Sequence, residues 1–361
     1  MRLRRRSIAL AVLVLIFLTV LPTVLQMYIP QEYFRAILTM TGYDLAALLN
    51  KIGVLGVAIS AFIILRGSVE KASKAGLGVS IAYKAFWLVV LFFVLGLGNI
   101  ENLGVAVLGG SAGMVGASIL AGRAALKCGA GRVHLALLTE HPPCVDYGQP
   151  ELMLRTPDGL FRGDEMTVIA AGPGMGRSDG AKRALRQALE SPSTLLLDAD
   201  ALNLVSDDPE LAEFTARRQA ATLLTPHPAE AGRLLGLSTR NVQDDRVAAA
   251  LAIAKRYRAF AALKGNGTIV AGPDGRWWVN PSGNAGMASA GMGDALTGLV
   301  AGLIAQGASP LDALLAGVWL HGAAGDAVAQ ANGGPLGITA SDLIDSARAL
   351  LNRSIYPAAA S

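Results

Sequence analysis

The chain has 361 residues, enough for about two domains of ordinary size; 52% of its residues are hydrophobic and 16% are charged. This composition excludes an intrinsically disordered chain and a coiled coil, and the 42 glycines, which follow no Gly-X-Y period, exclude collagen. Residues 1–100 carry 10 basic and 3 acidic side chains, a net charge of +7, whereas the 21 basic and 24 acidic side chains of the remainder give −3. The basic excess therefore predicts a membrane segment and no nucleic-acid-binding surface.

An uncharged run over residues 7–28 follows four arginines among the first six residues. As a helix, this run would span roughly 33 Å, which is enough to cross the hydrocarbon core of a bilayer. A secretory signal peptide is the weaker interpretation, because the run is long and no small-residue cleavage site closes it. Two shorter apolar runs follow at residues 52–65 and 85–98. We expect residues 1–100 to form two or three membrane-associated hydrophobic helices.

From residue 101 onward, strand-length apolar runs alternate with segments of helical periodicity, which is typical of a mostly parallel sheet with helices on both faces. The predicted strands are residues 105–108, 132–138, 167–171, 194–197, 221–224, 259–263 and 268–271. The predicted helices are residues 116–127, 179–190, 244–258, 294–306, 310–330 and 340–350. Residues 101–361 therefore predict one large α/β domain. The two cysteines, Cys128 and Cys144, lack the spacing of metal ligands, and we expect reduced thiols.

Two glycine-rich turns follow predicted strands, at residues 109–117 and 172–176. Glycines in such turns allow close backbone approach, and the free N–H groups of a following helix can bind an anion. Their spacing is not G-x-G-x-x-G, so we do not expect a Rossmann dinucleotide site. Taken alone, each turn is equally well explained as a tight turn without a ligand.

The tetrapeptide Gly291-Met292-Gly293-Asp294 opens a predicted helix of small residues. Its backbone N–H groups, aided by the helix dipole, could stabilise charge on a transferring phosphoryl group. Asp294 could then deprotonate a substrate hydroxyl in line with that phosphate. The alternative is structural, because an aspartate at a helix start is a common N-cap.

Three further segments carry polar residues at strand ends. Residues 264–268 (KGNGT) lie between two predicted strands and could wrap a nucleotide phosphate, or form a plain hairpin loop. His227 stands between prolines where a strand ends and a helix begins. Asp198 and Asp200 follow another strand, where they could orient Mg²⁺ through water or cap the next helix.

Together and in this order, these segments resemble the ADP/ATP-dependent NAD(P)H-hydrate dehydratases of the ribokinase-like superfamily. The matching stretches, which extend from about residue 104 to residue 350, are GGSAGMVGASILAGRAALKCGAGRV, AAGPGMGRS, LLDADALNLV, LLTPHPAEAGRLLG, ALKGNGTIVAGPDG, GNAGMASAGMGDALTGLVAGLIAQG and GVWLHGAAGD. Sugar and thiazole kinases of that superfamily share mainly the G-x-G-D element.

The resemblance implies a ribokinase-like fold and repair of a damaged cofactor. Members use ADP or ATP, with Mg²⁺ on the phosphates, to phosphorylate the hydroxyl of the S-epimer of hydrated NADH or NADPH (NADHX or NADPHX). Loss of phosphate then restores the reduced nicotinamide ring. The enzyme would be a lyase whose partners are these small molecules, and the sequence leaves a homo-oligomer open.

The resemblance also implies roles for individual residues. Asp294 would be the base and would contact the hydrate. The implied anion hole consists of Gly291, Met292 and Gly293. The implied contacts with the AMP portion of the nucleotide are Lys264, Gly265, Asn266, Gly267, Thr268 and Gly293. The implied contacts with the hydrate are Ala117, Gly172, His227 and Asn284, the last of which would help to close the site. No residue is assigned to a metal.

The sequence departs from the family before the first strand, where members carry His-Lys-Gly and residues 99–104 read NIENLG. Two alternatives stay open. One is a small-molecule kinase that retains its phosphorylated product, and the other, suggested by the missing His and Lys, is a degenerate nucleotide-binding domain on a membrane anchor. Because the implied substrates are cytoplasmic, we expect membrane association through the N-terminus with the catalytic domain on the cytoplasmic side. That orientation requires an even number of membrane crossings.

Overall fold

The computed structural model describes residues 104–161 and 166–356. The chain divides into two units, Met1–Glu101 and Asn102–Ser361, and the described residues belong to the second. The membrane-associated helices predicted in residues 1–100 lie outside the described residues. Within the described residues, no helix combines the length and the apolar character needed to span a membrane.

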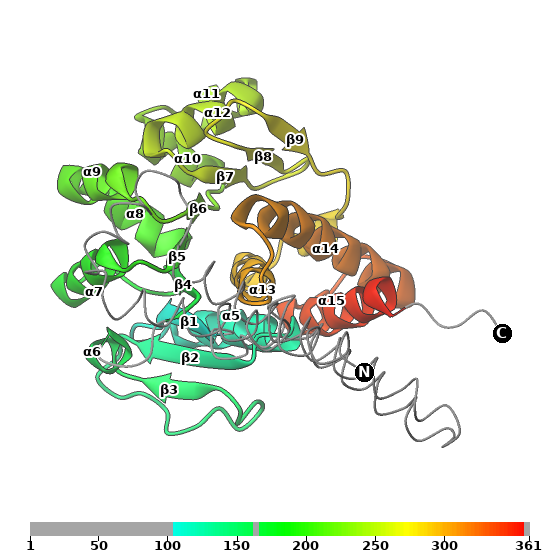
Figure 1. Cartoon of the computed structure of the whole chain (residues 1–361). Helices are drawn as coiled ribbons and strands as arrows, with labels where there is room; N and C mark the ends of the chain where they lie inside the picture. Colours follow the sequence, from blue (N-terminus) through cyan, green and yellow to red (C-terminus); the bar gives the residue numbers. More distant parts are fainter. Residues whose placement is uncertain (1–103, 162–165, 357–361) are drawn as a thin grey trace, which may run out of the picture. The chain divides into compact units, whose positions relative to one another are not determined.

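The described residues form a mixed sheet with the strand order β3-β2-β1-β4-β5-β6-β7-β8-β9 (Figure 1). Neighbouring strands from β3 to β7 are parallel, whereas β8 and β9 extend the sheet as antiparallel strands. The strands are β1 (Gly104–Gly109), β2 (Arg132–Leu137), β3 (Met153–Arg155), β4 (Val168–Ala171), β5 (Thr194–Leu197), β6 (Thr222–Leu224), β7 (Phe260–Leu263), β8 (Ile269–Ala271) and β9 (Trp277–Val279). All seven predicted strands are confirmed. The two edge strands, β3 and β9, were not predicted, because each has three residues and no buried side chain.

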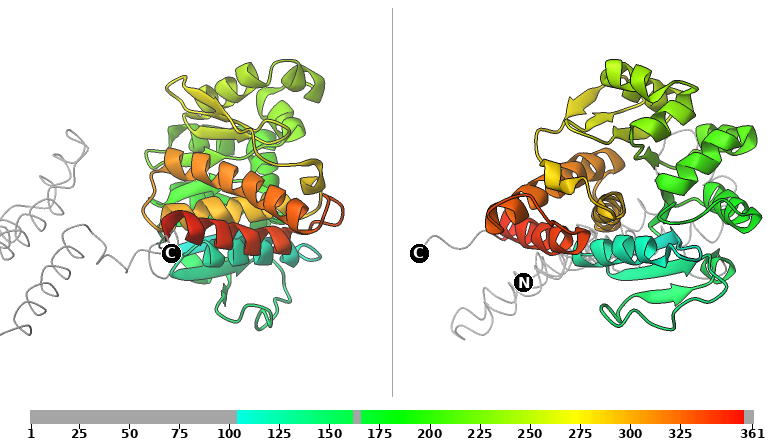
Figure 2. Two further views of the ribbon diagram at one scale, coloured as in Figure 1. Left: turned by 90° about the vertical axis from the view of Figure 1, so that its right-hand side faces the viewer. Right: turned by 180° about the vertical axis from the view of Figure 1, so that it is seen from behind.

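Helices cover both faces of the sheet, as predicted. Figure 2 shows α5, α13, α14 and α15 together on one face. The helices are α5 (Val115–Lys127), α6 (Pro157–Phe161), α7 (Asp179–Glu190), α8 (Ala199–Asp207), α9 (Pro209–Arg217), α10 (Pro228–Leu235), α11 (Thr239–Asp244), α12 (Arg246–Tyr257), α13 (Met292–Ala305), α14 (Pro310–Ala331) and α15 (Ala340–Ile355). The predicted helix 244–258 begins later, because Asp245 caps α12 by accepting a hydrogen bond from the N–H of Ala248 at 2.9 Å.

The strands separate two hydrophobic clusters. Val105 and Val107 of β1 face the cluster formed with α5, α13 and α14, whereas Ala106 and Leu108 face the cluster formed with α7, α8, α10 and α12. This alternation follows from the two-residue period of a strand. Both faces are apolar because both are covered by helices, so the central strands read as continuous hydrophobic runs.

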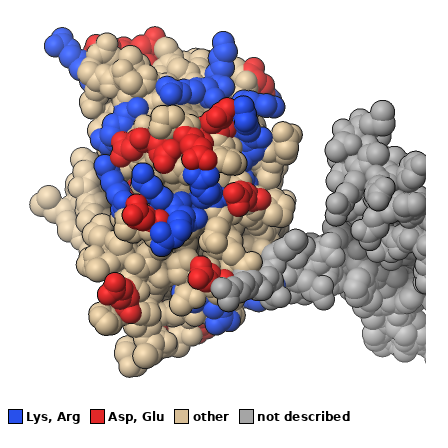
Figure 3. All heavy atoms as spheres, turned by 90° about the vertical axis from the view of Figure 1, so that its left-hand side faces the viewer, with Lys and Arg blue, Asp and Glu red and all other residues tan. Residues whose placement is uncertain are grey.

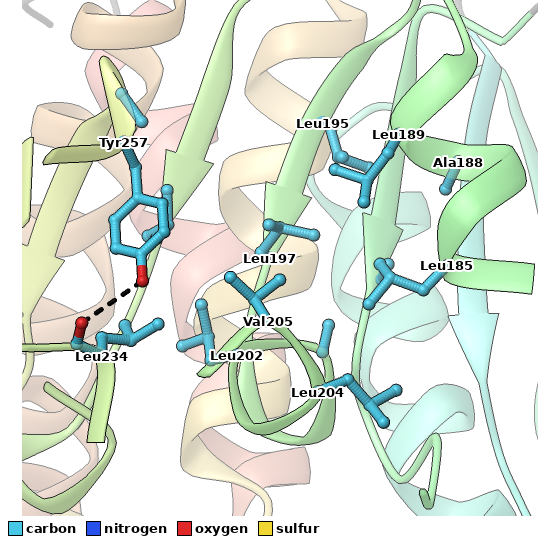
Figure 4. Close-up of a cluster of buried hydrophobic side chains, with 14 of the residues drawn as sticks. Leu185, Ala188, Leu189, Leu195, Leu197, Leu202, Leu204, Val205, Leu234 and Tyr257 are labelled. Atoms are coloured by element: carbon cyan, nitrogen blue, oxygen red, sulfur yellow. Dashed lines mark hydrogen bonds between the residues drawn. The ribbon is translucent and has the colours of Figure 1, made fainter. Parts of the chain in front are cut away.

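Figure 4 shows part of the second cluster, between α7, α8 and the sheet. Its leucines are fully or almost fully buried. The ring of Tyr257 at the end of α12 is also buried, and its hydroxyl donates a hydrogen bond to the carbonyl oxygen of Leu234 at 3.3 Å. This bond satisfies the one polar group that the buried ring brings into the core.

Charged side chains of both signs are interspersed on the face seen in Figure 3. Ion pairs join α7 and the residue pair before it to the adjoining ends of α8 and α9: Arg177–Asp207 at 3.3 Å, Lys182–Asp208 at 3.6 Å and Arg186–Glu210 at 2.6 Å. These exposed pairs add little to stability individually.

The strand order reverses at β1. The chain runs from β1 to β2 and β3 on one side, and then returns to place β4 on the other side of β1. In open α/β sheets, ligands bind beyond the carboxyl ends of the strands at such a switch point. The two glycine-rich turns predicted from the sequence follow β1 and β4, so they lie at this point.

Close packing of α13 on α5 generates a prediction about stability. A Cβ atom on Gly298 would overlap the carbonyl oxygen of Ala121, whereas a Cβ atom on Gly116, in the first turn of α5, would meet nothing within 4 Å. We expect Gly298→Ala to lower the free energy of unfolding by about 1–3 kcal/mol through overpacking. The control Gly116→Ala should leave it unchanged or raise it by up to about 1 kcal/mol. Denaturant unfolding of both variants measures the difference, and equal effects would contradict this account.

Candidate active site

The loops that follow β1 and β4 are hydrogen-bonded to each other. The N–H of Gly110 donates to the carbonyl oxygen of Pro173 at 3.0 Å, and the N–H of Ser111 donates to that of Gly174 at 2.6 Å. Gly174 has a φ of +59°, and a Cβ atom there would lie 3.2 Å from the Cβ of Ala117. The two glycine-rich turns therefore form one surface, and Ala117 lies on it.

Gly172 packs on the end of β5. Its φ is +127°, and a Cβ atom would overlap the carbonyl oxygen of Asp198. Packing alone therefore requires glycine at position 172. The contact of Gly172 with substrate stays a prediction. Ala199, which follows Asp198, has a φ of +45°, a conformation that costs a non-glycine residue about 1–2 kcal/mol. Strain of this kind persists where the surroundings impose it, and it is typical of functional sites.

Asp198 is buried at the centre of the site, with 1% of its side chain exposed. One carboxylate oxygen accepts a hydrogen bond from Nζ of Lys264 at 2.6 Å, and the other accepts one from Oγ1 of Thr297 at 2.9 Å. Asp198 occupies the N-cap position of α8, but its side chain makes no capping hydrogen bond. The interpretation of Asp198 as a simple helix cap is therefore wrong, because its carboxylate faces β7 and α13.

The Lys264 ammonium group lies between two carboxylates. Its Nζ is 4.0 Å from Oε2 of Glu230, and a Cβ atom on Gly293 would lie 3.4 Å from it. Burial alone would lower the pKa of Lys264, but the charges of Asp198 and Glu230 more than offset this and raise it above the ordinary lysine value. Burial raises the pKa of Glu230, which Lys264 opposes. Lys264 therefore stays charged directly beside Gly293.

His227 caps α10. Its Nδ1 accepts a hydrogen bond from the N–H of Ala229 at 3.1 Å, so the neutral ring carries its proton on Nε2, which lies 3.2 Å from Oε1 of Glu230. Burial, together with the charges of Lys264 and Arg233, lowers the pKa of His227. The imidazole is about half exposed and neutral. Its contact with the hydrate stays a prediction.

The segment 264–268 is the hairpin loop between β7 and β8. The guanidinium group of Arg246 braces this turn by donating to three carbonyl groups at 3.1–3.4 Å, including those of Lys264 and Gly267. The N–H of Lys264 donates to the carbonyl oxygen of Pro226 at 2.8 Å. The hairpin interpretation is thus correct for the backbone, while the side chain of Lys264 points into the site. Contact of this loop with a nucleotide stays a prediction.

The predicted anion hole lies at the N-terminus of α13. Gly291 is the N-cap, with a φ of +85°, and Met292, Gly293 and Asp294 form the first helical turn. The N–H groups of this turn have no partner within the helix, and the helix dipole favours negative charge in front of them. Asp294 is the third helical residue, so its interpretation as an N-cap is wrong.

The Asp294 carboxyl group has the properties of a base. Burial and the neighbouring charge of Asp198 raise its pKa to about 6, a shift that Lys264 opposes and Asp200 reinforces. Within the described part of the chain, no other side chain or backbone N–H is hydrogen-bonded to this carboxylate. It is therefore available to accept a proton near neutral pH.

Asn284 precedes a short 3-10 helix (Ala285–Met287). Its Oδ1 accepts a hydrogen bond from the N–H of Gly286 at 3.0 Å, and its Nδ2 donates to Oδ1 of Asp326 at 2.9 Å. Its amide is thus engaged in holding the loop. The role of Asn284 in closing the site stays a prediction.

The fold brings Gly172, Lys264 and Gly293 around Asp198, as the resemblance implies for one site. The sequence did not mark Thr297 or Arg246 as site residues: Thr297 lies in the stretch that follows GMGD but had no assigned role, and Arg246 lies outside the matching stretches. Asp200 accepts a hydrogen bond from the N–H of Gly176 at 2.9 Å and thereby links α8 to the second glycine-rich turn.

Among the described residues, no group of three or more His, Cys, Asp or Glu side chains is arranged to hold a metal ion.

Comparisons with known proteins agree with this geometry. The family described as NAD(P)H-hydrate dehydratase matches residues 105–348. The chain is 43% identical to the ADP-dependent (S)-NAD(P)H-hydrate dehydratase of Neisseria meningitidis over 69% of this chain and 85% of that protein. It is 41% identical to the bifunctional NAD(P)H-hydrate repair enzyme of Coxiella burnetii over 69% of this chain, and the match covers 50% of the length of that protein.

A solved structure shows the same fold. The ADP/ATP-dependent NAD(P)H-hydrate dehydratase of Bacillus subtilis, crystallised with ATP and Mg²⁺, superposes with a TM-score of 0.61 at 30% identity. The superposition covers 69% of this chain and 89% of that one. The α/β, ribokinase-like fold with a mostly parallel sheet is thereby confirmed for the described residues.

The buried Asp198–Lys264 pair predicts a large stability effect. Lys264→Met would leave the carboxylate of Asp198 buried without its counter-ion, and we expect the free energy of unfolding to fall by about 3–5 kcal/mol. The double variant Asp198→Asn/Lys264→Met removes the buried charge and should recover most of this loss. The control Arg177→Met removes an exposed partner of Asp207 and should cost under about 1 kcal/mol. Denaturant unfolding provides the comparison, and a loss in Lys264→Met no larger than in the control would contradict the pairing.

Proposed function

Because the chain belongs to the NAD(P)H-hydrate dehydratase family, we propose that it restores NADH and NADPH from the S-epimers of their hydrates, with ADP or ATP as phosphoryl donor. The observation that carries this proposal is the Asp294 carboxyl group. It stands in the first turn of α13, beside free backbone N–H groups, and its pKa is raised to about 6.

The first step is phosphoryl transfer. The Asp294 carboxylate takes the proton of the hydroxyl that was added to the nicotinamide ring, and the hydroxyl oxygen forms a bond to the terminal phosphorus of the nucleotide. The bond from that phosphorus to the bridging oxygen breaks, which releases AMP from ADP or ADP from ATP. Mg²⁺ enters with the nucleotide as part of the substrate and neutralises phosphate charge.

The second step is elimination. A proton passes from the ring carbon next to the phosphorylated one to solvent, the carbon–oxygen bond breaks, and inorganic phosphate departs with its electron pair. The ring regains its double bond, so the net reaction removes one molecule of water at the expense of one phosphoanhydride bond. Phosphate is a far better leaving group than hydroxide, which explains the need for a nucleotide.

Each part of the described site has a role in this chemistry. The N–H groups of Gly291, Met292 and Gly293 stabilise charge on the transferring phosphoryl group. Residues 264–268 and Gly293 hold the AMP portion of the nucleotide. Ala117, Gly172, His227 and Asn284 contact the hydrate, on the surface formed by the glycine-rich turns and its neighbours.

The proposal extends to the whole chain. Residues 1–100 form a membrane-associated unit and residues 101–361 the catalytic unit. The apolar runs and the basic excess of residues 1–100 support the first assignment. The catalytic unit lies on the cytoplasmic side, where its cofactor substrates are formed.

The direct test is recovery of reduced cofactor. The purified full chain is mixed with hydrated NADH or NADPH, Mg²⁺, and either ADP or ATP, and the absorbance of the reduced nicotinamide ring is followed. We expect absorbance and free phosphate to rise together. Accumulation of a phosphorylated hydrate would instead indicate a kinase, and no change with either nucleotide would contradict the proposal.

Asp294→Asn should abolish turnover and retain nucleotide binding, because it removes the base and keeps the size of the side chain. The matched control is Asp312→Asn, which changes the exposed acidic residue at the same helical position in α14 and should retain wild-type turnover. Calorimetric titration with ADP and the absorbance assay separate binding from catalysis. Wild-type turnover in Asp294→Asn would remove Asp294 from this role.

The pKa of Asp294 also predicts a pH dependence. The carboxyl group must be ionised to act as a base, so kcat should fall about tenfold per pH unit below pH 6 and level off above it.

The stability of the folded chain should change with pH in the opposite sense. The folded-state pKa of about 6 lies above the ordinary aspartate value of 3.8, so the folded chain binds more protons between these values and loses stability as pH rises through them. Asp294→Asn should therefore be no less stable than wild type at pH 7, and a large loss of stability there would contradict the assigned pKa.

A further inference from the structure

One motif of the sequence has no role in the proposed chemistry. The stretch GVWLHGAAGD, residues 317–326, lies within α14, which contributes no base, nucleotide contact or substrate contact. His321 and Gly325 are four residues apart, as are Gly322 and Asp326, so the two pairs lie side by side along one face of the helix. That face contacts the loop that leads into α13.

His321 reaches the first turn of α13. Its Nε2 lies 2.9 Å from the carbonyl oxygen of Met292. Burial lowers the pKa of His321 to about 4, so the ring is neutral at pH 7. A carbonyl oxygen can only accept, so the single proton of the neutral ring is on Nε2 and is donated to Met292. The carbonyl oxygen of Met292 and the N–H of Gly293 belong to the same planar peptide group. A hydrogen bond that fixes the oxygen therefore also fixes the direction of that N–H.

Asp326 holds the start of the same loop. Its Oδ2 accepts a hydrogen bond from the N–H of Gly283 at 2.8 Å, and its Oδ1 accepts the bond from Nδ2 of Asn284 at 2.9 Å. Between these two anchors, a Cβ atom on Gly322 would overlap Ser282, and one on Gly325 would overlap the sulfur of Met287. The loop therefore lies directly on the backbone of α14.

We propose that His321 and Asp326 are positioning residues, which hold the loop from Gly283 to Met292 so that the N–H groups at the start of α13 face the transferring phosphoryl group. This inference rests on the proposed function, because it assigns the phosphoryl group to that helix terminus. Neither side chain needs to touch the nucleotide. An anion hole stabilises charge only when its donors are already aligned, since realignment during the reaction would cost the energy that they supply.

The inference predicts a separation between phosphate recognition and the rest of nucleotide binding. AMP lacks the phosphoryl group that is transferred, whereas ADP carries it. A misaligned anion hole should therefore weaken the binding of ADP and leave the binding of AMP unchanged. A residue needed only for folding would weaken both nucleotides together.

The test uses four variants of the full chain. His321→Phe removes the donor and keeps a ring, His321→Gln keeps an N–H donor at a similar reach, and Asp326→Ala removes the acceptor from an exposed position. Gln330→Ala is the control, because Gln330 is an exposed residue one turn beyond Asp326 in the same helix, and its side chain makes no hydrogen bond within the described part of the chain. The readouts are kcat, KM for the hydrate, and the affinities for ADP and for AMP by titration calorimetry.

We expect His321→Phe and Asp326→Ala to lower kcat by roughly tenfold or more. KM for the hydrate should stay within about twofold of wild type in His321→Phe, whereas Asp326→Ala also releases Asn284, a proposed hydrate contact, and should raise that KM. The preference of both variants for ADP over AMP should fall by a factor similar to that of kcat. His321→Gln should recover most of both properties, and the control should match wild type. If His321→Phe fails to fold, Asp326→Ala gives the same comparison, because Asp326 is exposed and its replacement creates no cavity.

Some outcomes would overturn the inference. They are wild-type kcat and wild-type ADP preference in both His321→Phe and Asp326→Ala, or equal losses of ADP and AMP affinity. A wild-type chain that binds ADP no better than AMP would also overturn it. If instead the wild type fails to regenerate reduced cofactor while the variants still lose their ADP preference, the proposed function fails and the positioning role stands.

Discussion

The charge of Asp198 organises the site. A carboxylate with almost no exposed surface is stable only beside a counter-ion and hydrogen-bond donors, and here these come from Lys264 of the hairpin and Thr297 of α13. Gly172 also packs closely against the carbonyl oxygen of Asp198. The contacts of this one buried residue therefore bring together the segments of Gly172, Lys264 and Thr297. These are the segments assigned to the hydrate, to the nucleotide and to the anion hole, respectively.

The same charge has a chemical consequence for its neighbour. Asp198 and burial together raise the pKa of Asp294, while Lys264 limits the rise. An isolated aspartate is a weak base at neutral pH, because its ordinary pKa is near 3.9. Two carboxylates sharing one lysine thus take different roles: one is held by its partners, and the other is left able to accept a proton. The ion pair that stabilises the fold therefore also shifts the pKa of Asp294.

The sequence predicted the central sheet well because buried parallel strands are continuous apolar runs bounded by glycine turns. It did not predict β3 or β9, because edge strands of three residues without a buried side chain show no such run. The glycine-rich turns and the GMGD segment were located correctly at strand ends and at a helix start. Arg246 and Thr297 were not identified, because an arginine in one helix and a threonine in another have no local pattern that marks them as site residues.

The order of seven of the strands, the glycine-rich turns and six of the helices, and the presence of an aspartate at the start of α13, were determined by the sequence alone, since hydrophobic period and glycine placement are local properties. Only the tertiary structure decided that this aspartate is not the N-cap and that its pKa is raised. Asp198 is 66 residues from Lys264 and 99 from Thr297 along the chain, yet hydrogen-bonded to both. The pKa of a buried group depends on distances of a few ångströms between such remote segments, and local sequence patterns carry no information about those distances.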